Sequence, residues 1–125
     1  MSVFVDEKER IEITVYFTEN KNGKIDILPS EQAGCKSIMI KFKRPDFAMS
    51  QRLVAANSTI SQNGDQILNL AQLQNSLLYA LADGWDAKSE NGDPVVLDDK
   101  SISKMRIEIA RAAVNGFIET AGAIL

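Results

Sequence analysis

The sequence predicts an α+β fold in which a small antiparallel sheet of three or four strands precedes three helices. Apolar and polar residues alternate with a period of two through most of residues 1–44, as they do in half-buried strands. From Pro45 onward, residues 45–125 place their apolar side chains at helical spacing instead. A chain of 125 residues has the size of one domain, and no repeat or linker divides it.

Three alternating runs predict the strands. The pair Asn22-Gly23 lies between the first two runs and favours a tight hairpin turn, because both residues tolerate a positive φ. Pro29 ends the second run, and the third follows a loop through Gly34. Residues 2–5 are a candidate for a short edge strand. The side chains expected to face the core are Ile11, Ile13, Val15, Phe17, Ile25, Ile27, Ile38, Ile40 and Phe42.

Three later segments have the spacing of amphipathic helices. The first begins after Pro45 and runs to about Asn57, where residues 58–65 break it. The second covers residues 66–84 and stops at Gly84, a residue typical of helix ends. The third and longest covers residues 101–121. The expected N-caps are Asp46, Asp65 and, for the third helix, Asp98, Asp99 or Ser101.

Composition narrows the possible functions. The net charge of −3 and the pI near 4.9 argue against a nucleic-acid surface, which needs a basic stripe. The chain has no histidine and only Cys35, so it lacks the usual general base, metal ligand and disulfide. We therefore expect no enzyme activity, no catalytic residue, no cofactor and no metal site. The first residues form no secretion signal and no stretch suits a membrane, so a cytoplasmic location is expected.

The acidic loop after Trp85 is the first candidate site. Read as a calcium loop from Asp86, it has Lys88 at a ligand position, Gly92 one place late and Leu97 where a bidentate glutamate belongs. A surface loop is the better interpretation, with Trp85 packed over the helix end as its anchor. The basic residues are interpreted as a solvated strand face without aromatic residues to stack bases: Lys36, Lys41, Lys43, Arg44 and Arg52.

The scarcity of charge in the middle of the chain points to a protein partner. Between Arg52 and Asp83 the only charged residue is Asp65, although surface helices normally carry charged pairs. Uncovered apolar helix faces usually bind protein, so we expect either self-association as a homo-oligomer or another protein as the partner. The residues predicted to bind are Leu70, Leu73, Leu77, Tyr79, Leu81, Trp85, Ile109, Ala113 and Phe117.

The layout of the chain resembles that of the tail assembly chaperones of tailed bacteriophages. The resemblance covers roughly residues 36–118 and follows the order "SIMIKFKRPDFAMSQRLVAA", "ALADGWD" and "NGDPVVLDDKSISKM", with a closing alanine-rich helix. The matching positions are residues 41–45, Trp85, Gly92, Pro94, Leu97, Ser101, Ile102 and Phe117.

This resemblance implies a non-enzymatic helper protein in the cytoplasm of a bacterial host. Such proteins bind the tape-measure protein, shield its hydrophobic helices before the tail tube polymerises, and recruit tube subunits. Two alternatives remain open at this point. One is a small tail or baseplate protein that is retained in the virion, and the other, from a different class, is a small regulatory or ligand-binding module.

Overall fold

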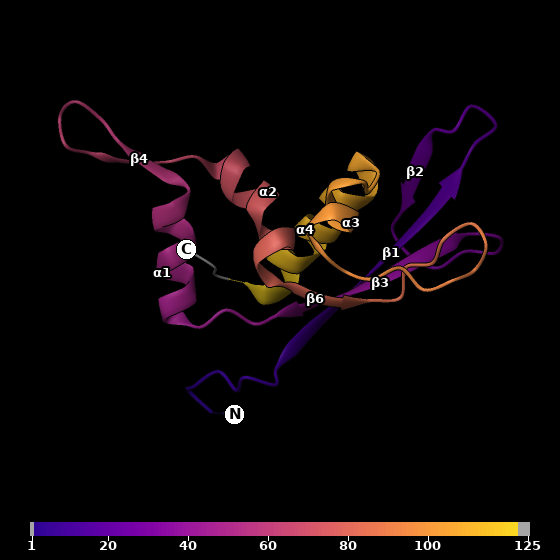
Figure 1. Cartoon of the computed structure of the whole chain (residues 1–125), viewed down its shortest axis with the longest axis horizontal. Helices are drawn as coiled ribbons and strands as arrows, with labels where there is room; N and C mark the ends of the chain where they lie inside the picture. Colours follow the sequence, from indigo (N-terminus) through magenta and orange to yellow (C-terminus); the bar gives the residue numbers. More distant parts are fainter. Residues whose placement is uncertain (1, 123–125) are drawn as a thin grey trace.

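The structure is a computed structural model and describes residues 2–122. A four-stranded antiparallel sheet packs one of its faces against helices, and a separate two-stranded hairpin projects from the helical side (Figure 1). The α+β class, the N-terminal sheet and the long last helix are confirmed. The elements are β1 (Arg10–Glu19), β2 (Ile25–Leu28), β3 (Lys36–Lys43), α1 (Phe47–Ala56), β4 (Ser58–Ile60), β5 (Gln66–Leu68), α2 (Leu70–Leu81), β6 (Ala82–Trp85), α3 (Asp99–Ser103) and α4 (Ile107–Ala121).

The main sheet has the strand order β2-β1-β3-β6, with every neighbouring pair antiparallel. The predicted hairpin joins β1 and β2 at Asn22-Gly23, where Gly23 has a φ of +79° and its N–H donates to the carbonyl of Asn20. As predicted, the alternation buries Ile11, Ile13, Val15, Ile40 and Phe42, whereas Phe17 and Ile38 are half-buried. Ile27 is an exception at 41% exposure, because β2 is an edge strand with a neighbour on one side only.

The fourth strand of the sheet is β6, and not the N-terminal segment. Residues 2–5 form no strand, and Val3 and Phe4 are 90% and 80% exposed. Strand β6 pairs with β3 instead, with Gly84 opposite Lys41 and Ala82 opposite Phe42. Strand β6 follows α2 directly, and it places Trp85 at the edge of the sheet.

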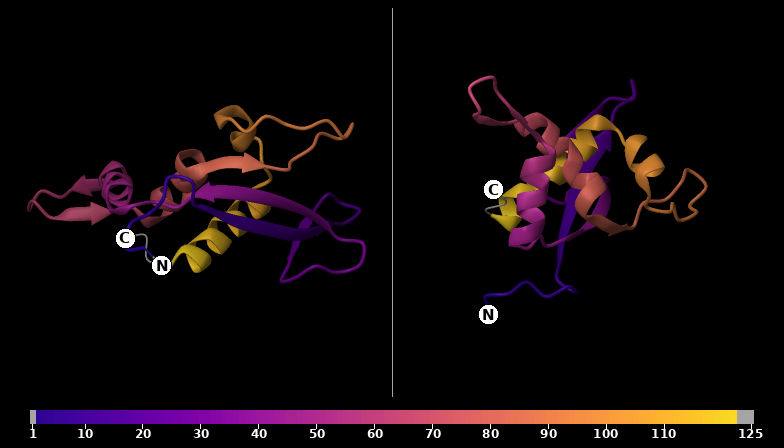
Figure 2. Two further views of the ribbon diagram at one scale, coloured as in Figure 1. Left: turned by 90° about the horizontal axis from the view of Figure 1, so that it is seen from below. Right: turned by 60° about the vertical axis from the view of Figure 1, so that its left-hand side comes forward.

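Helix α4 forms the main contact with the sheet (Figure 2). The ring of Phe117 stacks on that of Phe42 with centroids 4.6 Å apart and an interplanar angle of 18°, and both side chains are fully buried. Gly116, one residue earlier, lets the helix backbone approach β1: a Cβ there would lie 2.9 Å from Cγ2 of Ile13. Helix α2 then packs beside α4 and over β3.

The prediction of one helix over residues 66–84 was wrong at both ends. Residues 66–68 form β5, which pairs with β4 around the Asn63-Gly64 turn, and residues 82–85 form β6. Helix α2 is the part between them. Its N-cap is Asn69, whose side chain accepts a hydrogen bond from the backbone N–H of Gln72, and Asp65 belongs to the hairpin turn instead.

The single helix predicted over residues 101–121 is two helices, so the chain has four helices within the described residues. Helix α3 is capped by Asp98, whose carboxylate accepts from the Ser101 N–H at 2.8 Å. That hydrogen bond is the main cause of a lowered Asp98 pKa. Bonds to carbonyls three residues back, from the N–H groups of Lys104 and Met105, tighten and end α3 before α4 begins. The cap of α1 at Asp46 is confirmed.

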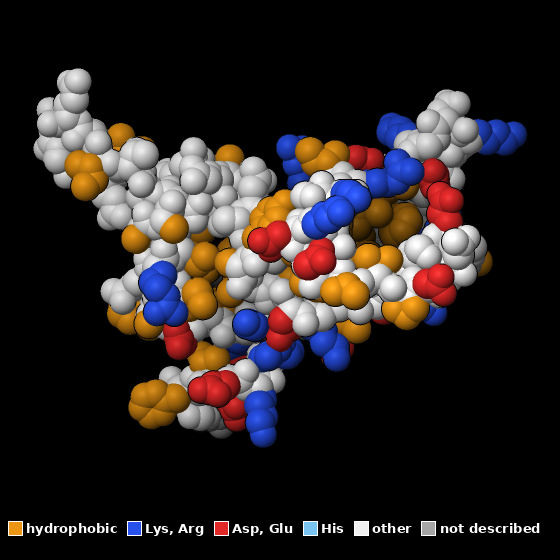
Figure 3. Space-filling model, viewed as in Figure 1, with side chains coloured by type: hydrophobic (Ala, Val, Ile, Leu, Met, Phe, Trp, Pro, Cys, Tyr) orange, Lys and Arg blue, Asp and Glu red, His pale blue; other side chains and the backbone are white. Residues whose placement is uncertain are grey.

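The hairpin of β4 and β5, residues 58–68, is called the β4–β5 arm below. It extends away from the sheet and from α3 and α4 (Figures 1 and 2). Only three residue pairs hold its two strands in register, and the side chains of Ile60 and Ile67 are 76% and 53% exposed. In the view of Figure 3 the arm shows apolar and uncharged side chains, whereas charged ones surround the sheet.

Candidate functional site

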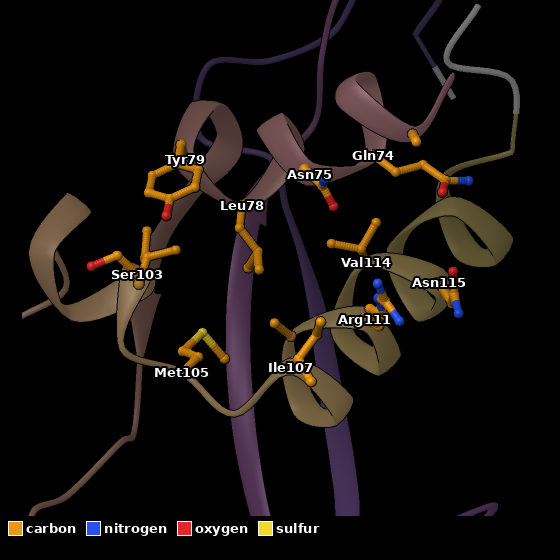
Figure 4. Close-up of a pocket in the computed structure, with 13 residues that line it drawn as sticks. Gln74, Asn75, Leu78, Tyr79, Ser103, Met105, Ile107, Arg111, Val114 and Asn115 are labelled. Carbon is orange, nitrogen blue, oxygen red and sulfur yellow. The ribbon is translucent and has the colours of Figure 1, made fainter. Parts of the chain in front are cut away.

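A groove of about 570 Å³ lies between α2 and α4, and α3 with its connection to α4 closes one end (Figure 4). Its floor is formed by buried apolar side chains, one from each of the three helices: Leu78, Ile102 and Val114. Figure 4 shows Leu78, Val114 and Ile107 directed into the space between α2 and α4. The groove is therefore a trough with an apolar floor built from residues distant in the sequence.

The rim of the groove is polar but almost uncharged. Gln74 and Asn75 come from α2 and Asn115 from α4, and Arg111 is the only charged residue that lines the groove. Within residues 2–122, Arg111 makes no ion pair, whereas Arg106 nearby is paired with Glu19. Amide side chains can both donate and accept hydrogen bonds, so this rim suits an uncharged polar backbone or side chain.

The groove also presents apolar side chains at its edges. Ile107 is 55% exposed and Tyr79 is 45% exposed, and the half-buried Met105 also lines the groove. Exposed large apolar residues on either side of a trough lose unfavourable hydration when a partner covers them. At about 25 cal/mol per Å² of apolar area, covering this surface would supply the principal gain in free energy on binding.

Most of the residues predicted to bind a partner form the core of the protein itself. Leu73, Leu77, Leu81, Ile109, Ala113 and Phe117 are at most 9% exposed, so a partner cannot contact them in this structure. The scarcity of charge along α2 reflects in part the burial of these side chains against the sheet and α4. Leu70 is 53% exposed at the start of α2 beside the arm, and Trp85 is half-buried.

Tyr79 is the one predicted residue that lines the groove. Five other apolar residues that line the groove were not among the predicted binding residues: Leu78, Ile102, Met105, Ile107 and Val114. The available signal was the polar and uncharged set Gln74, Asn75 and Asn115, which is unusual on exposed helix surfaces.

Trp85 holds the loop that follows it, and it does so from the end of strand β6. Its indole Nε1–H donates to the carbonyl of Val95 at 2.7 Å, and the Val95 N–H donates to the carbonyl of Ala87 at 3.0 Å. These bonds fold residues 86–95 into a third narrow hairpin, whose turn contains Asn91-Gly92. The segment is thus a structural hairpin. Asp86 ties its start to β3, because its carboxylate accepts a hydrogen bond from the Met39 N–H at 2.8 Å, whereas Glu90 and Asp93 are exposed.

Most of the basic residues on and beside the sheet are paired with acids. A second hollow of about 360 Å³ includes Arg10 and Arg44, but Arg10 binds Asp83 at 2.6 Å and Arg44 binds Glu9 at 2.9 Å. On the open face of the sheet, Lys41 lies 4.0 Å from Glu12. These exposed pairs stabilise the surface weakly. Lys43 and Arg52 also line the second hollow and form no ion pair among the described residues, but Asp6, Glu7 and Asp46 line it with them.

Other classes of site receive no support from the geometry. Within residues 2–122, no three cysteine, aspartate or glutamate side chains are grouped so that they could hold a metal ion. None of the helices in that range has both the length and the apolar character required to cross a bilayer. Comparison with known protein families, with characterised proteins and with solved structures finds no match in any of the three.

Proposed function

We propose that this protein is a non-enzymatic binding protein that holds an uncharged, apolar segment of another protein in the groove between α2 and α4. The observation that carries the proposal is the combination of an apolar floor, exposed apolar edges at Tyr79 and Ile107, and a rim with a single charge at Arg111. A rim of amide side chains costs less to desolvate than a charged rim, while a floor drawn from three helices offers apolar contact along its length.

An amphipathic helix is the segment that fits this trough best. Two helices with a gap between them provide parallel rows of apolar side chains, into which a third helix can place residues at i, i+3, i+4 and i+7. A tail assembly chaperone, the family that the sequence resembles, needs such a site for the hydrophobic helices of a tape-measure protein. We therefore propose that role in the cytoplasm of a bacterial host, with tail-tube subunits as further partners.

A role as a small tail or baseplate protein is the second candidate. The exposed β4–β5 arm favours it, because protruding hairpins with exposed isoleucines suit permanent contacts between subunits. Mass spectrometry of purified particles separates the two roles. A chaperone is absent from mature particles, whereas a structural subunit is present in stoichiometric amounts.

Binding of a synthetic helix tests the proposed function. The probe is a fluorescent peptide of more than about 15 residues, long enough to form a helix, with leucine and alanine on one face and glutamine on the other. Gln74→Lys places a second positive charge beside Arg111 in the rim. Lysine is chosen rather than glutamate because a glutamate at this position could form an ion pair with Arg111. Gln72→Lys makes the same change on the same helix but outside the groove, and serves as the control.

The expected result is that Gln74→Lys weakens binding of the probe roughly tenfold, because desolvating the added charge costs on the order of 1–2 kcal/mol. Gln72→Lys should bind like the unmodified protein. Fluorescence anisotropy measures both affinities, and circular dichroism checks that both variants are folded. Equal weakening by the two lysines, or no binding by the unmodified protein, would contradict the proposed site.

A further inference from the structure

We infer that the β4–β5 arm of one molecule occupies the α2–α4 groove of a second copy, so that molecules associate head to tail. The inference rests on the proposed function in that it uses the same groove, and it names one occupant of that groove. It is carried by a match between the two surfaces in apolar character, in hydrogen-bonding groups and in charge.

The arm is a surface that requires a partner. A two-stranded hairpin is only marginally stable by itself in water, and this one has three paired residues in each strand. Its outer edges lack the lysine, proline or bulge that usually protects an edge strand. Ile60 and Ile67 lie on opposite faces, since Ile60 is paired with Gln66 and Ile67 with Thr59, so both faces of the arm expose a large apolar side chain.

The groove offers what the arm lacks. Its apolar floor and edges can cover an isoleucine side chain, and its amide rim can bond to the unpaired backbone groups of the strand edges. The charges also correspond. Asp65 is the only charged residue of the arm, and Arg111 is the only charged residue that lines the groove. Within the described residues, neither of these two side chains has an ion-pair partner.

An arm cannot fill the groove of its own chain in this structure. The arm extends from the ends of α1 and α2 in the direction away from α3 and α4 (Figures 1 and 2), and its isoleucines are exposed. Contact between two different surfaces on identical molecules is heterologous, and it produces closed rings or open chains. In such an assembly each arm also protects a groove, so a helical client must displace the arm of a neighbouring molecule to bind.

Charge reversal tests the pairing of Asp65 with Arg111. Sedimentation velocity over a concentration series measures self-association of the unmodified protein, of Asp65→Lys and of Arg111→Glu. Each single change brings like charges together and should weaken association at least about tenfold. The control for Asp65→Lys is Asp93→Lys, because Asp93 occupies the same position in a turn with the same hydrogen bonds, Ser89 N–H to Asp93 O and Gly92 N–H to Ser89 O.

Mixing the two variants gives the sharpest result. Asp65→Lys has a positive arm and a positive groove, and Arg111→Glu has a negative arm and a negative groove, so neither should associate alone. In an equimolar mixture each arm meets a groove of opposite charge, and alternating assembly should return. Arg52→Glu, a reversal on an exposed face of α1, is the control for Arg111→Glu and should associate like the unmodified protein, since its arm and groove are unchanged.

Several results would overturn the inference. One is a protein that remains monomeric at high concentration, and another is a mixture that associates no better than its components. Undiminished association of Arg111→Glu would indicate that arms pair with arms. None of these results bears on the probe helix, so a monomer that still binds the probe through Gln74 disproves the head-to-tail contact and leaves the proposed function intact. Conversely, if the mixture assembles but the protein does not bind the probe, the proposed binding of a helical client is disproved and the head-to-tail contact stands.

Discussion

Replacing Gly116 with alanine tests how closely α4 lies on the sheet. A Cβ at this position would be 2.9 Å from Cγ2 of Ile13, a methyl group on the branched β-carbon of a residue that is 8% exposed. This methyl cannot move away without a change of χ1 in the core or a displacement of the helix. Because α4 forms one wall of the groove, such a displacement would also alter the site.

Two opposing contributions determine how much Gly116→Ala changes the free energy of unfolding. Overpacking of a core costs about 1–3 kcal/mol, whereas alanine is more favourable than glycine inside a helix by about 1 kcal/mol. The expected result for Gly116→Ala is a net loss of roughly 1 kcal/mol in unfolding free energy. This corresponds to a decrease of about 4 °C in Tm, or of about 0.5 M in the urea midpoint at an unchanged slope.

Urea unfolding of a double-mutant cycle isolates the contact. Ile13→Leu removes the methyl at Cγ2 while it conserves side-chain volume, so Gly116→Ala should become neutral or stabilising in that background. Gly84→Ala is the control, because a Cβ at Gly84 would lie at an ordinary 3.6 Å from Cδ of Lys41. A Gly116→Ala protein about 1 kcal/mol more stable than the unmodified one would refute the reasoning, since only the helix propensity would then remain.

Three further predictions concern the loop, the helix cap and metal ions. Trp85→Phe should lower the free energy of unfolding by about 1 kcal/mol, because the 2.7 Å hydrogen bond to the carbonyl of Val95 is lost. It should also accelerate hydrogen exchange of the Val95 N–H, and unchanged exchange would contradict the anchoring role of Trp85. Because the folded Asp98 pKa lies below its ordinary 3.8, the charged cap contributes stability above that pH and loses it as the pH falls through the folded pKa. The advantage of the unmodified protein over Asp98→Asn should therefore shrink below about pH 4, and a pH-independent difference in urea titrations would count against it. Calcium or zinc should leave Tm unchanged, and a rise of several degrees in calorimetry would reveal a metal site.

The sheet was predictable because its strands are half-buried. One face of β1 packs on α4 and the other meets solvent, so the sequence alternates and the inward residues could be named individually, from Ile11 to Phe42. The β1–β2 turn was equally clear, since Asn22-Gly23 is flanked by alternating runs on both sides.

The β4–β5 arm was missed although its turn contains the same Asn-Gly pair. Each of its strands has three residues, which is too short for a period of two to be distinguished from helical spacing. Residues 66–68 therefore appeared as the first turn of a helix. In the structure the turn makes these residues a strand, because the Ser61 N–H donates to the carbonyl of Asp65 and the two strands pair on either side of the turn.

The groove could be predicted only in part, because it depends on where α3 ends. The prediction placed Ile102 and Ile107 on one continuous helix over residues 101–121. In the structure the chain breaks at residues 104–106, and both residues line the same groove as Leu78. That break follows from local hydrogen bonds at Lys104 and Met105 and from burial of Ile102, neither of which has a clear signature in the sequence.

The most direct test of the groove is a map of the bound probe helix on the protein. Backbone amide and methyl chemical shifts of isotope-labelled protein are followed by NMR during titration with the leucine–alanine–glutamine peptide, using the Asp65→Lys variant to keep the grooves free of arms. The largest changes should fall on Leu78, Ile102 and Val114 and on the edges of the groove at Tyr79 and Ile107. Changes centred on the open face of the sheet around Lys41, or no changes at saturating peptide, would contradict the account.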